Sequence, residues 1–116
     1  MNLYLDTSNF EAIIKLEDPN TGEIFEYKDN LSHEMAEKLL ETLRNHLEEH
    51  KRTFQDLKKI TFMSGPGSFT GLRIGAAIVN ALAHELNIPL FDHKGKQHKI
   101  ILPDYGRPAN ISAPKK

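Results

Sequence analysis

The sequence predicts one α/β domain, a mixed sheet with helices packed on it in the order β-β-β-α-β-α-β. Three patterns predict this fold class. Apolar residues alternate along the first 28 residues, recur at a helical period over 33–50, and fill a second helix-length segment over 72–86. With 116 residues the chain can build a single core, which excludes large two-lobed enzymes. Because it has no cysteine, disulfides, thiolate zinc sites and cysteine nucleophiles are excluded as well.

Residues 2–28 are expected to form an antiparallel β-meander. Leu3 and Leu5 mark the first strand, and a second run with apolar alternation covers 11–17. The segment 18–22, Asp-Pro-Asn-Thr-Gly, consists of residues that favour turns. The next residues, Ile-Phe-Glu-Tyr, are therefore expected to pair with the second strand as a hairpin.

Apolar residues recur every four positions after Ser32, which predicts an amphipathic helix over 33–50 with Ser32 as its N-cap. Shortly after this helix, Thr53 and Asp56 have the spacing of a capping box and predict one helical turn. The apolar stripe of the helix is expected to consist of Met35, Leu39, Leu43 and Leu47, widened by Ala36 and Leu40.

The next elements are expected to be a strand over 59–64, a glycine-rich loop over 65–71, a helix over 72–86 and a strand over 88–92. Asn87 and Pro89 are typical of a helix end. Strands that are separated by helices run parallel, whereas the first hairpin is antiparallel, so the sheet should be mixed. Residues 100–102 could add one short strand.

The chain divides by charge near residue 93. Residues 1–93 carry 9 basic and 15 acidic side chains, whereas 94–116 carry six basic side chains against Asp104 alone. We therefore expect a domain over 1–93 and a basic, proline-containing tail over 94–116. Such a tail can contact nucleic acid or an acidic partner, or it can simply be solvated. The candidates for a nucleic-acid contact are Lys94, Lys96 and Lys99.

Targeting and membrane segments are not expected. The first six residues lack the basic and apolar regions of a secretory signal, and no apolar run exceeds four residues. We therefore expect a cytoplasmic protein that has no contact with a membrane.

The helix over 72–86 has little polar surface. So small a domain has little to cover it, which leaves two interpretations: a partner covers part of it, or it is a fully internal core helix. Gly71 and Gly75, four residues apart, form a flat stripe that would let another helix approach closely. The residues expected to be shared between core and interface are Leu39, Leu43, Leu47, Gly71, Gly75, Ile78, Val79 and Leu82.

A glycine-rich loop joins the strand over 59–64 to this helix. Free amides and the helix dipole at such a place can hold a phosphate, but the loop lacks the lysine of a Walker loop. A purely geometric role is the alternative. The residues of this motif loop are Gly65, Pro66, Gly67, Ser68, Phe69, Thr70 and Arg73.

The eleven residues 65–75 resemble the GPGSFTGLRIG motif of the TsaB (YeaZ) family. Three further stretches agree with the family in order and spacing, namely Leu5 to Ser8, His33-Glu34 with the leucines that follow, and residues 86–90. The resemblance covers residues 1–93. It implies an RNase H-like lobe of the actin-like ATPase superfamily. Because the chain is much shorter than the usual member, it implies the N-terminal lobe only.

The resemblance also implies a function. The family is a subunit of the machinery that installs threonylcarbamoyl on a tRNA adenosine beside the anticodon. It implies a non-catalytic scaffold for the paralogue TsaD, which would form a heterodimer with TsaD and a homodimer when alone. The ATPase TsaE is a further candidate partner, and tRNA would be met only through the assembled complex. No catalytic residue, cofactor or metal is expected.

The alternative function is a small RNase H-like metal-dependent hydrolase or a peptidase. Asp6, at the end of the first strand, is where such enzymes place a magnesium ligand, but two-metal chemistry needs several converging acids. We expect Asp6 to stabilise a turn instead. His46 and His50 fit an inverted zincin pattern, yet they lie at a helix C-terminus, where histidine is common without a metal.

Overall fold

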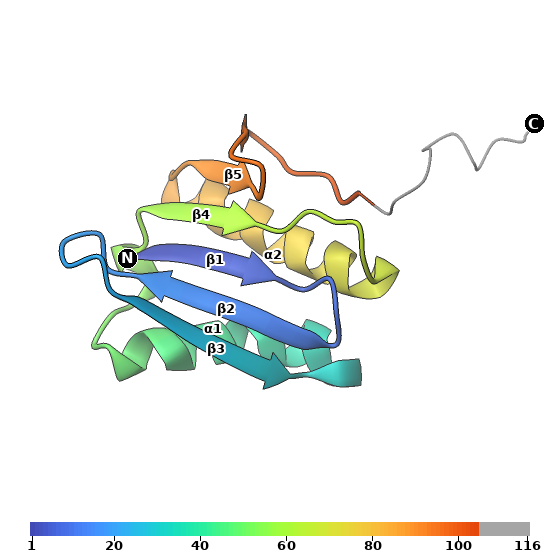
Figure 1. The fold of residues 1–116 in the computed structure, drawn as a ribbon, viewed down its shortest axis with the longest axis horizontal. Helices are drawn as coiled ribbons and strands as arrows, with labels where there is room; N and C mark the ends of the chain where they lie inside the picture. Colours follow the sequence, from blue (N-terminus) through green and yellow to red (C-terminus); the bar gives the residue numbers. More distant parts are fainter. Residues whose placement is uncertain (105–116) are drawn as a thin grey trace, which may run out of the picture.

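The computed structural model describes residues 1–104, which form a six-stranded sheet with two helices on one face (Figure 1). The strand order is β3-β2-β1-β4-β5-β6. The α/β class with a mixed sheet is therefore confirmed. The elements are β1 (Asn2–Asp6), β2 (Glu11–Glu17), β3 (Ile24–Asn30), α1 (Met35–Glu49), β4 (Lys59–Phe62), α2 (Phe69–Leu86), β5 (Leu90–Asp92) and β6 (Gln97–His98), with short 3₁₀ turns at Ser32–Glu34 and Phe54–Asp56.

The alternation of the sequence determines which face of the sheet is buried. Leu3 and Leu5 of β1 are buried, and the residues opposite them on β2, Leu16 and Ile14, are buried too. These side chains point toward the helices, while Tyr4 points to the opposite face of the sheet. β1, β2 and β3 pair antiparallel, whereas β4 pairs parallel with both β1 and β5. The hairpin and the parallel crossovers thus lie in one sheet, as predicted.

Helix α1 buries the predicted stripe of Met35, Leu39, Leu43 and Leu47, but it begins later than predicted. Ser32 is not its N-cap, because Ser32 has a left-handed backbone (φ 47°) and the α-helix begins at Met35. The Ser32 amide is directed back at the Phe10 carbonyl instead, at 3.5 Å. The capping box is confirmed: the Thr53 amide donates to Asp56 Oδ2 at 2.8 Å.

Helix α2 begins at Phe69, three residues before the predicted start. Ser68 is its N-cap, and the Ser68 hydroxyl accepts a hydrogen bond from the Gly71 amide at 3.2 Å. Part of the predicted loop is thus helical, because the glycine that suggests a loop serves packing instead. The helix ends at Asn87, whose left-handed backbone (φ 55°) places its amide on the carbonyls of the last turn.

The fold continues beyond the expected boundary at residue 93. β6 pairs antiparallel with β5, and Ile101, only 1% exposed, belongs to the hydrophobic core. The short strand is therefore at Gln97–His98 and not at 100–102. The remaining basic positions of the tail, Arg107, Lys115 and Lys116, lie outside the described residues.

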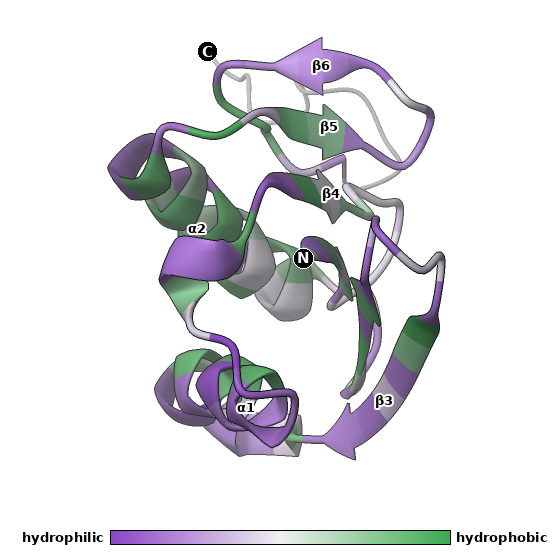
Figure 2. Cartoon of the chain, turned by 90° about the vertical axis from the view of Figure 1, so that its left-hand side faces the viewer, coloured by the Kyte–Doolittle hydropathy of each residue, from purple (hydrophilic) through white to green (hydrophobic). Residues whose placement is uncertain are grey.

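The domain has two layers, the sheet and the pair of helices, and the strand directions determine how the helices are oriented. Both helices lie on the same face of the sheet, side by side, and within residues 1–104 no helix covers the other face (Figure 2). Each helix follows a strand that runs in the direction of β1. Helices α1 and α2 therefore run parallel to one another, and both begin at the carboxyl ends of these strands. Within residues 1–104, no helix is both long and apolar enough to span a membrane.

Candidate functional site

The motif loop is packed against the end of β1. Thr7, which is fully buried, donates a hydrogen bond from its hydroxyl to the Gly71 carbonyl at 2.7 Å. The Ser68 amide donates to the Ser8 carbonyl at 2.8 Å, and a Cβ on Gly67 would lie 2.5 Å from Ser8 Cβ. The glycines therefore let the start of α2 contact the backbone of residues 7 and 8.

Gly75 continues this contact one turn along α2. A Cβ on Gly75 would overlap Thr7 Oγ1 and would lie 2.6 Å from the Phe62 ring, and a Cβ on Gly71 would overlap the Thr7 carbonyl oxygen. The flat stripe predicted to accept another helix thus faces β1 and β4 of the same chain. Gly71 and Gly75 are buried within the domain, so they are not on the surface that a partner could contact. A glycine stripe allows close approach of a sheet as well as of a helix, so the spacing of the two glycines alone does not tell which of them packs there.

The first residue of the motif loop is covered by the C-terminal segment. Gly65 has φ 123°, and a Cβ there would overlap the carbonyl oxygen of Asp104. The Asp104 amide donates to the Ser64 carbonyl at 2.6 Å. Ser64 also donates its amide to His93 Nδ1 at 3.3 Å. The ends of β4 and β5 are thus linked by a side chain that the sequence patterns did not indicate.

Asp6 stabilises a turn, as expected. Its Oδ1 accepts hydrogen bonds from the Ser8 amide at 2.9 Å and from the Ser8 hydroxyl at 2.5 Å. Within residues 1–104, no three His, Cys, Asp or Glu side chains are grouped so that they could hold a metal ion.

His46 and His50 are both bonded to strand β3. His46 Nε2 lies 2.8 Å from Asp29 Oδ2, and its ring stacks on Tyr27 at a centroid distance of 3.7 Å. His50 Nε2 lies 2.7 Å from the Tyr27 hydroxyl. Burial is the main cause that raises the pKa of Tyr27, and its hydrogen bond to Glu49 raises it further. The histidine pair therefore fixes α1 on β3, a role that helical spacing alone does not reveal.

The candidate interface residues separate into two groups. Leu39, Leu43, Leu47 and Val79 are at most 1% exposed and belong to the core. Only Ile78 and Leu82 of the eight candidates are partly exposed and packed on the core's margin. A four-residue period identifies the buried stripe, but it does not tell which neighbouring positions face a partner.

The flanks of the two helices identify those positions. His46 directs one flank of α1 toward β3, so Leu40, on the other side of the buried stripe, faces α2. Asn80 directs one flank of α2 toward Ile101, so helix geometry places Ile78 on the other flank, toward α1. The apolar residues along this junction form what we call the inter-helix face: Ala36, Leu40, Ile74, Ile78, Ala81 and Leu82.

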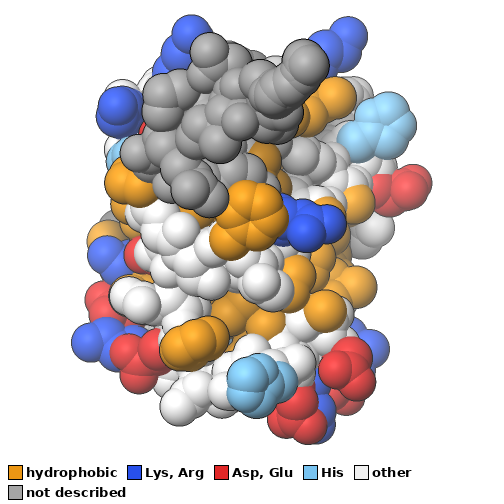
Figure 3. All heavy atoms as spheres, turned by 90° about the vertical axis from the view of Figure 1, so that its right-hand side faces the viewer, with side chains coloured by type: hydrophobic (Ala, Val, Ile, Leu, Met, Phe, Trp, Pro, Cys, Tyr) orange, Lys and Arg blue, Asp and Glu red, His pale blue; other side chains and the backbone are white. Residues whose placement is uncertain are grey.

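The inter-helix face is apolar and accessible. Leu40 is 46% exposed, and Ala36 and Ala81 are exposed. At the end where both helices begin, a hollow of about 280 Å³ lies between Met35 and Ile74, and Phe10 lines it. Figure 3 shows hydrophobic side chains spread over this end of the molecule.

The candidate tRNA contacts lie near the edge of the sheet that β5 and β6 form, opposite β3. Lys94, Lys96 and Lys99 are exposed and belong to the β5–β6 hairpin and the residue after it. Asp92 Oδ1 accepts the backbone amides of Lys94 and Lys96, both at 2.9 Å. The structure thus places Lys94 and Lys96 on a turn that belongs to the fold, whereas Lys99 lies beyond β6, at the other end of the hairpin.

The fold and the packed glycine loop define an RNase H-like lobe of the actin-like class. A family model described as TsaD, tRNA N6-adenosine threonylcarbamoyltransferase, matches residues 29–92. A protein named tRNA threonylcarbamoyladenosine biosynthesis protein TsaB from Bacillus subtilis is 36% identical over 88 residues, which is 76% of this chain and 38% of that protein. The protein of the same name from Buchnera aphidicola (Schizaphis graminum) is 37% identical over 68 residues, 59% of this chain and 32% of that protein.

The solved structures agree with these relatives. YeaZ from Pseudomonas aeruginosa superposes with a TM-score of 0.71 at 31% identity, covering 78% of this chain and 42% of that one. The chain therefore belongs to the TsaD family that the model describes, with the TsaB/YeaZ proteins as its relatives. It spans only 32–38% of the length of these two curated relatives.

Proposed function

We propose that the protein is a non-catalytic scaffold subunit in the biosynthesis of threonylcarbamoyladenosine in tRNA, and that it binds its partner through the inter-helix face. The names of the relatives support the pathway. The observation that carries the scaffold role is that two parallel helices each carry an apolar side chain outside the core, the exposed Leu40 on α1 and the partly buried Ile78 on α2.

The inter-helix face has the composition of an interface core. From Ile74 to Ala83, α2 contains no charged residue, and charged residues are depleted at the centres of interfaces. Two parallel helices lie side by side (Figure 2), and the side chains along them can form the ridges against which a second helix pair packs. A specific interface buries more than about 1,000 Å² in total, an area that two helices of this length can supply.

The motif loop supports the same proposal. Amides and glycines of the loop are used for packing: the Ser68 amide is bonded to Ser8 and the Gly71 amide to Ser68, and Gly67 and Gly71 lie against residues 7 and 8. A phosphate-binding loop must instead present its amides to a ligand. The approach of α2 to β1 explains the geometry of this loop.

We propose TsaD as the partner in a heterodimer, and a homodimer through the same face when TsaD is absent. TsaE is a further proposed partner, and tRNA would be met only through the assembled complex, in the cytoplasm. The central experiment measures association. Leu40→Glu and Ala81→Glu place a carboxylate on the inter-helix face at exposed positions, so they should leave the fold intact.

Asn45→Glu is the matched control, since it adds the same charge to an exposed position of α1 away from the face. Light scattering of the protein alone and calorimetry with TsaD should show association for the wild type and the control, and a loss of at least tenfold for Leu40→Glu. A wild type that is a strict monomer at high micromolar concentration and does not bind TsaD would contradict the proposal. So would equal association of Leu40→Glu and Asn45→Glu.

A ligand titration separates the scaffold from an enzyme. A metal-dependent hydrolase should be stabilised by Mg²⁺ or Zn²⁺, by about 2.7 kcal/mol at a metal concentration one hundred times the Kd. We expect the midpoint of thermal unfolding to stay the same with both metals. A reproducible shift with either of them would refute the non-catalytic role.

A further inference from the structure

A second hollow lies at the opposite end of α2, between the helix C-terminus and the β5–β6 hairpin. Its volume is about 620 Å³, within the range of small-molecule sites. We propose that this hollow binds a phosphate ester, with Lys99 and His84 contacting the phosphate and the apolar floor contacting the organic group. The proposal is independent of the inter-helix face.

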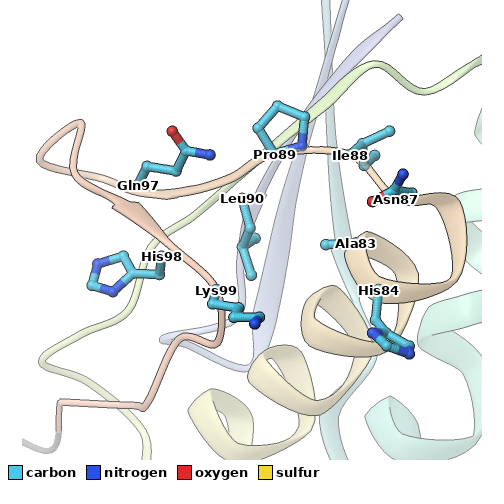
Figure 4. A pocket seen from close by; sticks show the side chains of 9 residues that line it. All are labelled: Ala83, His84, Asn87, Ile88, Pro89, Leu90, Gln97, His98 and Lys99. Carbon is cyan, nitrogen blue, oxygen red and sulfur yellow. The ribbon is translucent and has the colours of Figure 1, made fainter.

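One lysine and two histidines, Lys99, His84 and His98, are among the side chains that line the hollow. Lys99 and His84 line it together with the amide side chains of Asn87 and Gln97, and no acidic residue is part of its lining. Within residues 1–104, Lys99 forms no ion pair. Figure 4 shows the Lys99 side chain extending toward α2, the helix that carries His84. A cation without a carboxylate partner, beside two side-chain amides, can recognise an anion.

The helix C-terminus does not oppose an anion here. The last carbonyls of α2 would normally repel negative charge. In this structure the Asn87 amide donates to the His84 carbonyl at 3.3 Å, and the Ile88 amide donates to the Ala83 carbonyl at 3.1 Å. These two carbonyls already accept hydrogen bonds, and Lys99 supplies a cation that lines the same hollow.

The hairpin is held in place for such a site. His98 Nε2 lies 2.7 Å from Asp92 Oδ2, and Figure 4 shows the His98 ring pointing away from α2. Asp92 also accepts the amides of Lys94 and Lys96, so the turn of the hairpin is braced, and Lys99 follows directly after His98 at the other end of β6. The charge of Asp92 is thus bound within the hairpin and is not part of the hollow.

The floor of the hollow suits an organic group. Leu90 is 1% exposed, and together with Ile88 it gives the hollow an apolar base beside the polar rim. Inorganic phosphate would contact only the rim, whereas a ribose or base attached to phosphate would also cover the floor. The ester can come from a free nucleotide or from an RNA backbone, and the test distinguishes the two.

The experiment titrates the ¹⁵N-labelled protein with adenosine 5′-monophosphate, inorganic phosphate, adenosine and a short single-stranded RNA. We expect amide shifts confined to the residues that line the hollow, and tighter binding of the monophosphate than of phosphate or adenosine. If the RNA binds more tightly than the monophosphate with the same shifts, the source is RNA; the reverse order identifies a free nucleotide.

Lys99→Gln should weaken binding of the monophosphate about tenfold, because a hydrogen bond to a charged group is lost. Lys96→Gln is the matched control, since Lys96 is exposed on the same hairpin but does not line the hollow. The proposal is overturned if no lining amide shifts at 10 mM monophosphate, if Lys96→Gln weakens binding as much as Lys99→Gln, or if adenosine binds as tightly as its phosphate. Unchanged amide spectra of the free variants verify that both are folded.

Discussion

The hydroxyl of Thr7 and the backbone carbonyl of Gly71 are joined by a buried hydrogen bond of 2.7 Å. This bond connects the end of β1 to the first turn of α2 across 64 residues of chain. Because Gly71 has no side chain, the two backbones come close enough for the bond to form. The glycine-rich motif is therefore a joint between a strand and a helix.

Replacing Thr7 with valine should test this joint. Thr7→Val keeps the shape of the side chain but removes the donor, so we expect a loss of about 1–2 kcal/mol in the free energy of unfolding. Urea denaturation measures it. Thr61→Val on the open face of the sheet is the control, and it should change stability by less than about 0.5 kcal/mol. Equal effects of the two substitutions would argue against the joint.

Gly75→Ala should destabilise the protein. A glycine-to-alanine change inside a helix normally adds about 0.5–1 kcal/mol of stability, but the new Cβ would overlap Thr7 Oγ1 and crowd the Phe62 ring. We expect a net loss of about 1–3 kcal/mol, the usual cost of overpacking. Urea denaturation with Ala77→Gly as the reference for ordinary helix propensity measures it. A stabilised Gly75→Ala variant would show that the space around Gly75 is not filled.

Periodicity was sufficient to predict most of the fold. Alternation in β1 and β2 and the four-residue period of α1 each report one buried face, and burial is what the structure shows for Leu5, Ile14 and Leu39. The start of α2 was predicted too late because Gly71 breaks an apolar pattern and favours a loop. Its actual role depends on Thr7, a residue far away in the sequence.

The candidate site was harder to predict, because contacts that decide which flank of a helix faces outward are not periodic. Leu39 and Leu40 are adjacent leucines of one helix, yet the first is in the core and the second is exposed. The bonds of His46 to Asp29 and of Asn80 to Ile101 orient the helices. An apolar residue directly beside the main stripe, such as Leu40, was the one available signal for the inter-helix face.

Acid should loosen the β5–β6 hairpin only at very low pH. Hydrogen bonds from His98, and then from the Lys96 and Lys94 amides, lower the pKa of Asp92 from 3.8 to about 2. A lowered pKa in the folded state favours the ionised form. The contribution of Asp92 to stability is therefore complete above pH 3.8 and is lost as the pH falls through about 2.

This pH dependence can be isolated with Asp92→Asn. We expect the variant to be less stable than the wild type at pH 5, with a difference that shrinks as the pH falls from 4 to 2. Thermal unfolding across this range measures the difference, and Glu37→Gln, on the exposed surface of α1, should follow the wild type. A difference between wild type and Asp92→Asn that stays constant down to pH 2 would contradict the assignment.

The C-terminal segment should depend on a single side chain of α2. Asn80 Nδ2 donates to the Ile101 carbonyl at 3.0 Å, and the Ile101 amide donates to Asn80 Oδ1 at 2.9 Å. Asn80 thus pairs with Ile101 as a neighbouring strand would, and it holds the Ile101 side chain in the core. Asn80→Ala removes both bonds, so we expect a loss of about 1–3 kcal/mol.

Hydrogen exchange can localise that effect. In Asn80→Ala, the Ile101 amide should exchange at least tenfold faster than in the wild type. The exchange rates of the β1 amides should change only by the amount that the change in global stability predicts. Asn80→Asp keeps the acceptor for the Ile101 amide and loses the donor, so its exchange rate should be intermediate. Asn45→Ala, on the exposed side of α1, is the control. If the Ile101 amide exchanges at the same rate in Asn80→Ala and Asn45→Ala, then Ile101 is held by its buried side chain alone and the Asn80 pairing contributes nothing.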